Sequence, residues 1–351
     1  MIIPRRPLCR PPGRPPGRAL FAVLLLLALG QVGLRGGDAP DPMLALPELP
    51  RAKARSIPVP AALKEFAPGV LVAIGERVVL TGTLIIDQGP VDGLEVLACL
   101  ATGKTHESLV RLDAGNGQLV KAAFIAALGL ADGMSAPESS GHPGRGTPLR
   151  VEIEWDALDA PGTWHALDAS SLIRDRITDK GYPALPFIYT GSRFLVVDET
   201  APDGRPVRQE RFMLDNTKTV VGIVDEPDAL LASPSPGAGF DKHYEAYSAI
   251  CPPAGTKVRL VFSKLALPLM LTMDASGGLA KDGMPMDDAT LEAALTKAYG
   301  AGSEPIVRAV GIVVEAATAR DLDLAVRTRV LAAAARAKVW VVPVYQLVKA
   351  P

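Results

Sequence analysis

The chain has 351 residues, which is enough for two domains of ordinary size, and aromatic residues make up only 5% of it. So few aromatics argue against a stacking platform for single-stranded nucleic acid. The net charge is −1, but the first 36 residues contain six arginines and no acidic residue, so the remainder carries −7. An acidic body offers no electrostatic surface for DNA or RNA, and we expect no nucleic-acid partner.

Residues 1–34 have the pattern of a signal peptide or an N-terminal membrane anchor. Arginines and prolines precede the uncharged apolar core Ala19–Leu29, which is shorter than the roughly 20 residues that span a bilayer. Arginines before such a core predict that the rest of the chain crosses the membrane. We therefore expect export to the periplasm or to the outer face of the inner membrane. The small residues Ala28 and Gly30 favour cleavage, and the alternative is an anchor formed by residues 19–34.

Residues 35–69 contain six prolines between positions 40 and 60. Proline removes backbone donors and restricts the residue before it, so this density argues against regular structure. The sequence predicts a semi-rigid linker here, between the leader and the first folded segment.

Residues 70–265 alternate apolar and polar positions in short runs, which is typical of strands. The runs lie at 70–86, 93–101, 107–113, 149–155, 162–173, 187–199, 219–227 and 257–265. One amphipathic helix is predicted at 118–130, an exposed loop insertion at 135–147, and a hairpin turn at Asp203-Gly204. Asp198 and Glu199 read as a solvated strand end. This segment is predicted to be a β-rich domain with a single packed helix.

A different pattern occupies residues 266–351. A hairpin at 267–286 leads to a helix that begins at Asp287 and Asp288 and ends at Gly300. A strand at 306–316, an alanine-rich helix at Asp321–Ala337 and a strand at 339–347 then form a βαβ unit. The fold class predicted for the whole chain is α+β, with a small α/β domain after the β-rich one.

The polar turn between the runs at 93–101 and 107–113 is the most specific motif. Lys104, Thr105, His106, Glu107 and Ser108 follow a strand and Gly103, in the order G-K-T-H-E-S. A strand followed by a G-K-x-H-E-S turn resembles the YdjY-like domain of bacterial envelope proteins. The resemblance covers residues 77–265 of the domain predicted at 70–265 and implies an envelope protein, and it brings no known activity with it.

Two interpretations of this turn remain open. His106 beside Glu107 could act as a general base or as part of a metal site, with a further partner from His165, His243 or Glu95. Neighbouring residues of a strand point to opposite faces, however, so both can face one ligand only if the turn extends through them.

In the second interpretation the polar residues serve the fold. Lys104, Thr105 and Ser108 cap the turn, and Glu107 pairs with a lysine or an arginine. His106 would then be fixed by local hydrogen bonds, and its replacement would lower the melting temperature. This structural interpretation is the favoured one.

Ala98–Thr105 also fits the loose form of a P-loop. A P-loop requires a helix that starts at its Lys-Thr, whereas the residues after Thr105 read as a strand. We therefore expect no ATP and no other cofactor.

Cys99 and Cys251 could form a disulfide or remain free thiols, and the sequence leaves both alternatives open. Export to an oxidising compartment would permit a disulfide between them. Buried free thiols are the alternative, because Cys99 lies in an apolar run.

Residues 267–347 are similar to the periplasmic domain of ExbD/TolR-type proteins. The similarity lies in Asp274 and Gly277, in Gly283 before the helix, in Leu291 and Leu295, and in the order of elements up to the final strand. It implies docking or homodimerisation through this domain. Residues 19–34 contain no aspartate, so the proton coupling of that family is not implied.

The function predicted from the sequence is non-catalytic. An exported protein would bind another envelope or membrane protein, and its C-terminal domain would serve docking or dimerisation. The alternative is a metal- or ligand-dependent enzyme centred on His106, although no residue pattern identifies an enzyme.

Overall fold

The computed structural model describes residues 53–348 except for short internal stretches at 91, 132–144, 158–159, 161, 177, 201–203, 225, 236–243, 301–306, 316–317 and 320. The leader, most of the predicted linker and most of the predicted loop insertion lie outside the described residues. Strands predominate over helices, which confirms the α+β class in its mainly β form. No helix in the described part of the chain has the length and apolar character needed to cross a membrane.

Eight strands close into a barrel, a closure that the sequence did not predict. In order around the barrel they are β4 (Arg77–Leu84), β16 (Lys257–Lys264), β7 (Thr147–Asp156), β10 (Phe187–Tyr189), β14 (Leu231–Ala232), β13 (Thr219–Gly222), β5 (Val96–Cys99) and β6 (Ser108–Leu112). Strand β6 pairs with β4 again and completes the circle. Closure leaves these eight strands without a free edge.

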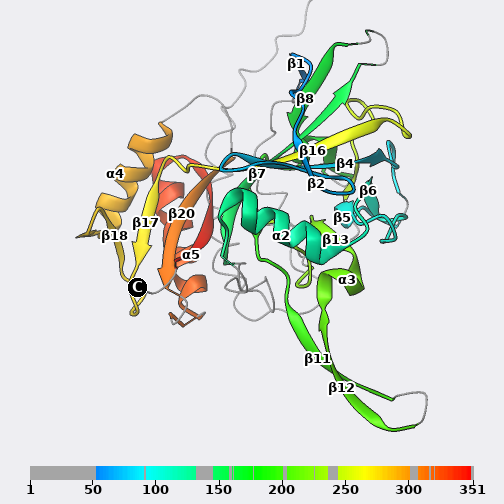
Figure 1. Ribbon diagram of the computed structural model, residues 1–351. Coiled ribbons are helices and arrows are strands. Elements are labelled where there is room, and N and C mark those ends of the chain that lie inside the picture. The colour runs from blue at the N-terminus through cyan, green and yellow to red at the C-terminus, as the bar shows by residue number, and fades with distance from the viewer. Residues whose placement is uncertain are drawn as a thin grey trace, which may run out of the picture.

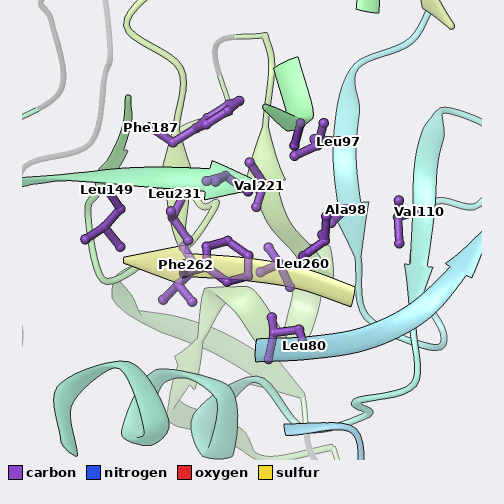
Figure 2. Close-up of a cluster of buried hydrophobic side chains, with 14 of the residues drawn as sticks. Leu80, Leu97, Ala98, Val110, Leu149, Phe187, Val221, Leu231, Leu260 and Phe262 are labelled. Atoms are coloured by element: carbon purple, nitrogen blue, oxygen red, sulfur yellow. The ribbon is translucent and has the colours of Figure 1, made fainter. Parts of the chain in front are cut away.

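The strand registers explain why the barrel interior is apolar. Leu260 of β16 lies opposite Leu80 on one side and Ile153 on the other. Phe262, two residues further, faces the same way because side chains alternate along a strand. Figure 2 shows a cluster of side chains from the barrel strands, and all of those labelled are almost completely buried.

Short strands extend the sheet beyond the barrel and correct the predicted linker. Strand β1 (Arg55–Ile57) pairs with β8 (Trp164–Asp168), and β2 (Lys64–Ala67) pairs with β3 (Val70–Ala73). The prediction that residues 35–69 lack regular structure is therefore wrong for their second half. Pro58 and Pro60 lie between β1 and β2, where they remove no ladder hydrogen bond. A separate small sheet joins β9 (Ile173–Asp175) and β15 (Tyr244–Ala246), next to the 3-10 turn Ala169–Leu172.

The predicted helix is α2 (Gly117–Leu128), which packs beside β3 and β4. The side chain of Asn116 accepts a hydrogen bond from the Leu119 amide, and Gly129 ends the helix in the left-handed region. Phe124 enters the core, where its ring lies 5.0 Å from that of Phe262 and 5.8 Å from that of Tyr189.

A two-stranded ribbon projects from the barrel, as Figure 1 shows at its lower right. We call it the arm; it consists of β11 (Phe194–Thr200) and β12 (Pro206–Phe212) and leads into the short helix α3 (Met213–Thr217). The predicted run 187–199 is thus two strands, because the chain leaves the barrel after Tyr189. Asp203 of the predicted turn lies outside the described residues, and β11 and β12 stand on either side of the predicted turn in the sequence.

The C-terminal unit is a five-stranded sheet beside the barrel (Figure 1). Its strands, in sheet order, are β19 (Met284–Pro285), β18 (Leu279–Lys281), β17 (Met270–Met273), β20 (Val307–Glu315) and β21 (Trp340–Val348). Strands β17, β20 and β21 are parallel, and α5 (Asp321–Ala337) connects the last two, as predicted. Helix α4 (Asp288–Tyr299) begins after its N-cap Asp287.

Arg145 connects this unit to the barrel from a segment that was predicted to be an exposed loop. Its side chain is 2% exposed and forms two hydrogen bonds of 2.7 Å with the carboxylate of Asp323 on α5, which is fully buried. It also donates to the Thr318 carbonyl at 2.9 Å. The Gly146 amide donates to the Tyr345 carbonyl of β21 at 2.8 Å. The prediction of exposure is therefore wrong for the end of the loop, because this end pairs with α5 and β21.

We predict that Arg145→Met lowers the free energy of unfolding by about 3–5 kcal/mol, since it leaves a buried carboxylate without its cation. The double variant Arg145→Met/Asp323→Leu should recover most of this loss, because it removes both charges. Urea unfolding at pH 7 measures the free energy of unfolding of the single and of the double variant. The control is Arg55→Met, whose 2.7 Å pair with Glu152 is more than half exposed on the arginine side and should matter little. Equal losses for the single and the double variant would contradict the account.

Candidate functional site

The GKTHES turn closes an unusually short connection between two parallel strands. Strands β5 and β6 are neighbours with Val96 opposite Ser108, and only residues 100–107 connect them. Parallel neighbours ordinarily need a dozen or more residues. Residues 100–107 must therefore turn back sharply toward the start of β5. The polar residues of the GKTHES turn lie at the end of this connection, next to β6.

Backbone and side-chain hydrogen bonds stabilise this connection between β5 and β6. The Gly103 amide donates to the Leu100 carbonyl at 2.8 Å, and the Ser108 hydroxyl donates to the Lys104 carbonyl at 2.6 Å. A Cβ atom on Gly103 would lie 2.6 Å from Cβ of Cys99, so glycine is required for this close approach. Ser108 thus caps the turn as predicted, whereas the Thr105 side chain is exposed.

Lys104 lies among three carboxylates that come from three parts of the chain. Its Nζ is 3.5 Å from Glu226 Oε2, 3.7 Å from Glu95 Oε2 and 3.7 Å from Glu107 Oε2. Burial opposes the ammonium charge, but the three carboxylates outweigh it and raise the pKa of Lys104 above its usual value. The pairing of Glu107 with a lysine, expected from the sequence, is present.

Glu226 is the member of this cluster that the sequence analysis missed. It lies between β13 and β14, more than a hundred residues from the turn, and only the pairing of β13 with β5 brings it close. A single glutamate in an acidic loop carries no local signal for such a contact.

His106 and Glu107 interact directly, because the turn does extend through both residues. His106 Nε2 lies 2.7 Å from Glu107 Oε1, while the His106 side chain is 74% exposed. A hydrogen bond with Glu95 lowers the pKa of Glu107 below its usual value, and the charges of Lys104 and His106 act in the same direction against partial burial. The structural interpretation expected local backbone groups or a carboxylate to hold His106, and the contact with the Glu107 carboxylate is of this kind, although the ring itself is largely exposed.

The structure describes two of the three predicted histidines, His106 and His165, and places them in different surroundings. His165 lies on β8, where its ring packs 5.5 Å from that of Trp155, and His243 lies outside the described residues. Among the residues that can be described, no three His, Cys, Asp or Glu side chains are grouped so as to hold a metal ion. In the turn itself the Lys104 ammonium occupies the centre of the carboxylates.

The structure also describes the P-loop-like segment and the two cysteines. Strand β6 follows the Lys-Thr pair of the P-loop-like segment at the point where a phosphate-binding loop would need a helix. Cys99 and Cys251 are free thiols, so the structure does not contain the disulfide that the sequence left open. Burial raises the pKa of Cys99, and it raises the pKa of Cys251 to about 12.

We predict that Lys104→Met lowers the melting temperature by several degrees, because three carboxylates lose their shared cation. His106→Ala is the matched comparison within the same turn. It removes one exposed pair and should cost less than about 1 kcal/mol. Thermal melts at pH 7 check both variants, and a larger loss for His106→Ala would contradict the assignment.

The turn should also lose stability in acid. The folded-state pKa of Glu107 is lowered, so its ionised carboxylate contributes stability at neutral pH, and this contribution is lost as the pH falls through that pKa. The difference in melting temperature between the wild type and Glu107→Gln should therefore be largest near neutrality and shrink below pH 4.5. Glu76→Gln, in an exposed turn, is the control. A difference that grows in acid would refute this role.

No known protein family, no curated protein and no solved structure matches the chain. The resemblances to the YdjY-like and ExbD/TolR-type domains therefore stay predictions that rest on the sequence motifs.

Proposed function

We propose that the protein is a non-catalytic, exported envelope protein that binds another envelope protein. The YdjY-like barrel is the scaffold, the arm is the main docking element, and the ExbD/TolR-like unit provides a further docking or dimerisation surface. The polar turn supports a non-catalytic role, because its charged residues bind one another and close a strand connection.

The observation that carries the proposal is the exposure of apolar side chains on the arm. Phe194, Val196 and Val207 are 48%, 56% and 43% exposed. A two-stranded ribbon is marginally stable by itself in water. Phe194 and Val196, two residues apart on β11, form an exposed apolar patch on one face, which is a mark of interaction sites, and Val207 lies on the opposite face. These side chains favour a partner protein that covers the ribbon.

The base of the arm is held firmly, which prepares the ribbon for binding. The rings of Phe194 and Phe212 lie 4.9 Å apart. Lys121 of α2 places its Nζ 5.4 Å and 5.2 Å from the two ring centres, and its side chain is almost fully buried. The two cation–π contacts fix the direction in which the arm leaves the barrel, so binding requires less ordering of the ribbon.

The C-terminal unit presents a further exposed apolar residue, which lies at a sheet edge. Strand β19 forms one edge of the five-stranded sheet, and Met284 on it is 71% exposed. An open edge with a flexible apolar side chain suits docking, which supports the role proposed for this unit.

A photo-reactive residue placed at position 196 should cross-link to another protein in the native envelope. Position 74 is the matched control, since Ile74 is 70% exposed but lies on a turn of the barrel. The cross-linked protein is identified by mass spectrometry and then purified for binding assays with the full chain.

Binding of this identified protein should be lost with Val196→Glu and retained with Ile74→Glu. The two variants add the same charge at exposed apolar positions, so they separate the arm from general surface effects. Equal cross-linking at both positions, or unchanged binding by Val196→Glu, would overturn the proposed function.

A further inference from the structure

We infer that β12 of the arm pairs with β12 of a second copy of the chain, so that two arms form one four-stranded sheet. This inference rests on the proposed function, in which the arm is a binding element, and it names one occupant of the arm. Two features of β12 point to a second copy as the partner: its unpaired backbone edge and the order of its charged side chains.

Both outer edges of the arm carry unpaired backbone groups in the described part of the chain. Strands β11 and β12 pair only with each other and form a separate two-stranded sheet. Such edges are templates for a further strand, and a sheet of four strands is more stable than one of two. Addition of a strand therefore satisfies backbone donors and acceptors that would otherwise bind only water.

Strand β12 is complementary to itself in an antiparallel arrangement. When two copies are centred on Gln209, Arg208 of each copy lies opposite the partner's Glu210. The symmetry generates this pair twice, and opposite charges directly across antiparallel strands stabilise the pairing. The register runs over Val207–Arg211, which leaves Pro206, without an N–H, at its end.

The contacts within one arm leave Glu210 suited to this role. Arg208 lies opposite Asp198 of β11 with 3.3 Å between Nε and Oδ1, and Arg211 pairs with Glu199. Glu210 instead lies opposite the apolar Val196. A second copy would place the partner's Arg208 beside this carboxylate.

The other edge does not show the same complementarity. Self-pairing of β11 about Val197 would place Asp198 opposite the partner's Val196 and Glu199 opposite the partner's Leu195. Acidic side chains would then face apolar ones, with no opposite charge. The charge sequences therefore select the edge of β12.

One strand pair buries less surface than a standard stable interface, so we expect a reversible dimer that exchanges quickly. Its affinity should fall as salt is added, because the two Arg–Glu pairs are exposed at the edge of the sheet. The test is sedimentation velocity of the purified full chain over a range of protein and salt concentrations.

Glu210→Arg should raise the dimer dissociation constant at least about tenfold, since like charges then face each other twice. Its partner variant is Asp198→Arg/Arg208→Glu, which reverses position 208 and keeps an opposite-charge pair within the arm. Each variant alone should be monomeric at concentrations where the wild type dimerises, and an equimolar mixture should form heterodimers. Glu76→Arg controls for the charge change, and thermal melts establish that every variant is folded.

A monomeric wild type, a dimer that persists in Glu210→Arg, or variants that fail to associate when mixed would each overturn the inference. If the chain instead dimerised through the C-terminal unit, the charge changes at positions 208 and 210 would leave the dissociation constant unchanged. The outcome is separate from the proposed function, because cross-linking from position 196 to another protein is scored independently of self-association.

Discussion

The structure depends on strand β16, which pairs with β4 along one edge and with β7 along the other. These two ladders belong to an eight-stranded barrel whose interior side chains form part of the larger hydrophobic cluster. The strands paired by this closure belong to distant parts of the chain, so every appended feature takes its position from it. The polar turn connects β5 to β6, the arm follows β10, and the start of β7 reaches the C-terminal unit.

Charged side chains stabilise the fold in two places: between the barrel and the C-terminal unit, and at the GKTHES turn. The Arg145–Asp323 pair is buried, bidentate and supplemented by carbonyl acceptors, so it specifies how the C-terminal unit meets the barrel and is costly to break from one side. The Lys104 cluster is partly exposed and holds a short strand connection closed. Both sets of residues serve the fold, and this leaves the exposed apolar and edge groups of the arm as the groups best suited to bind another molecule.

Local signals predicted the local elements well. Alternation located most strands, and cap residues such as Asp287 and Gly300 located helix ends within a residue or two. Long-range pairing had no such signal: barrel closure, the contact of Glu226 with Lys104 and the burial of Arg145 depend on residues far apart in the sequence. Pro58 and Pro60 of the predicted linker misled because they lie between β1 and β2 rather than in either strand. Strand β12 was missed because most of its side chains are polar or charged and exposed, which removes the alternation that marks a half-buried strand.

Backbone amide hydrogen exchange tests the central claim, that the turn serves the fold while the arm serves binding. We predict that exchange of the Glu107 and Ser108 amides is slow and independent of protein concentration. Within Val207–Arg211, the amides that face away from β11 should exchange fast in dilute protein, and their exchange should slow as the concentration rises. A turn that exchanges as quickly as an exposed loop, together with an arm whose exchange never changes with concentration, would contradict the account.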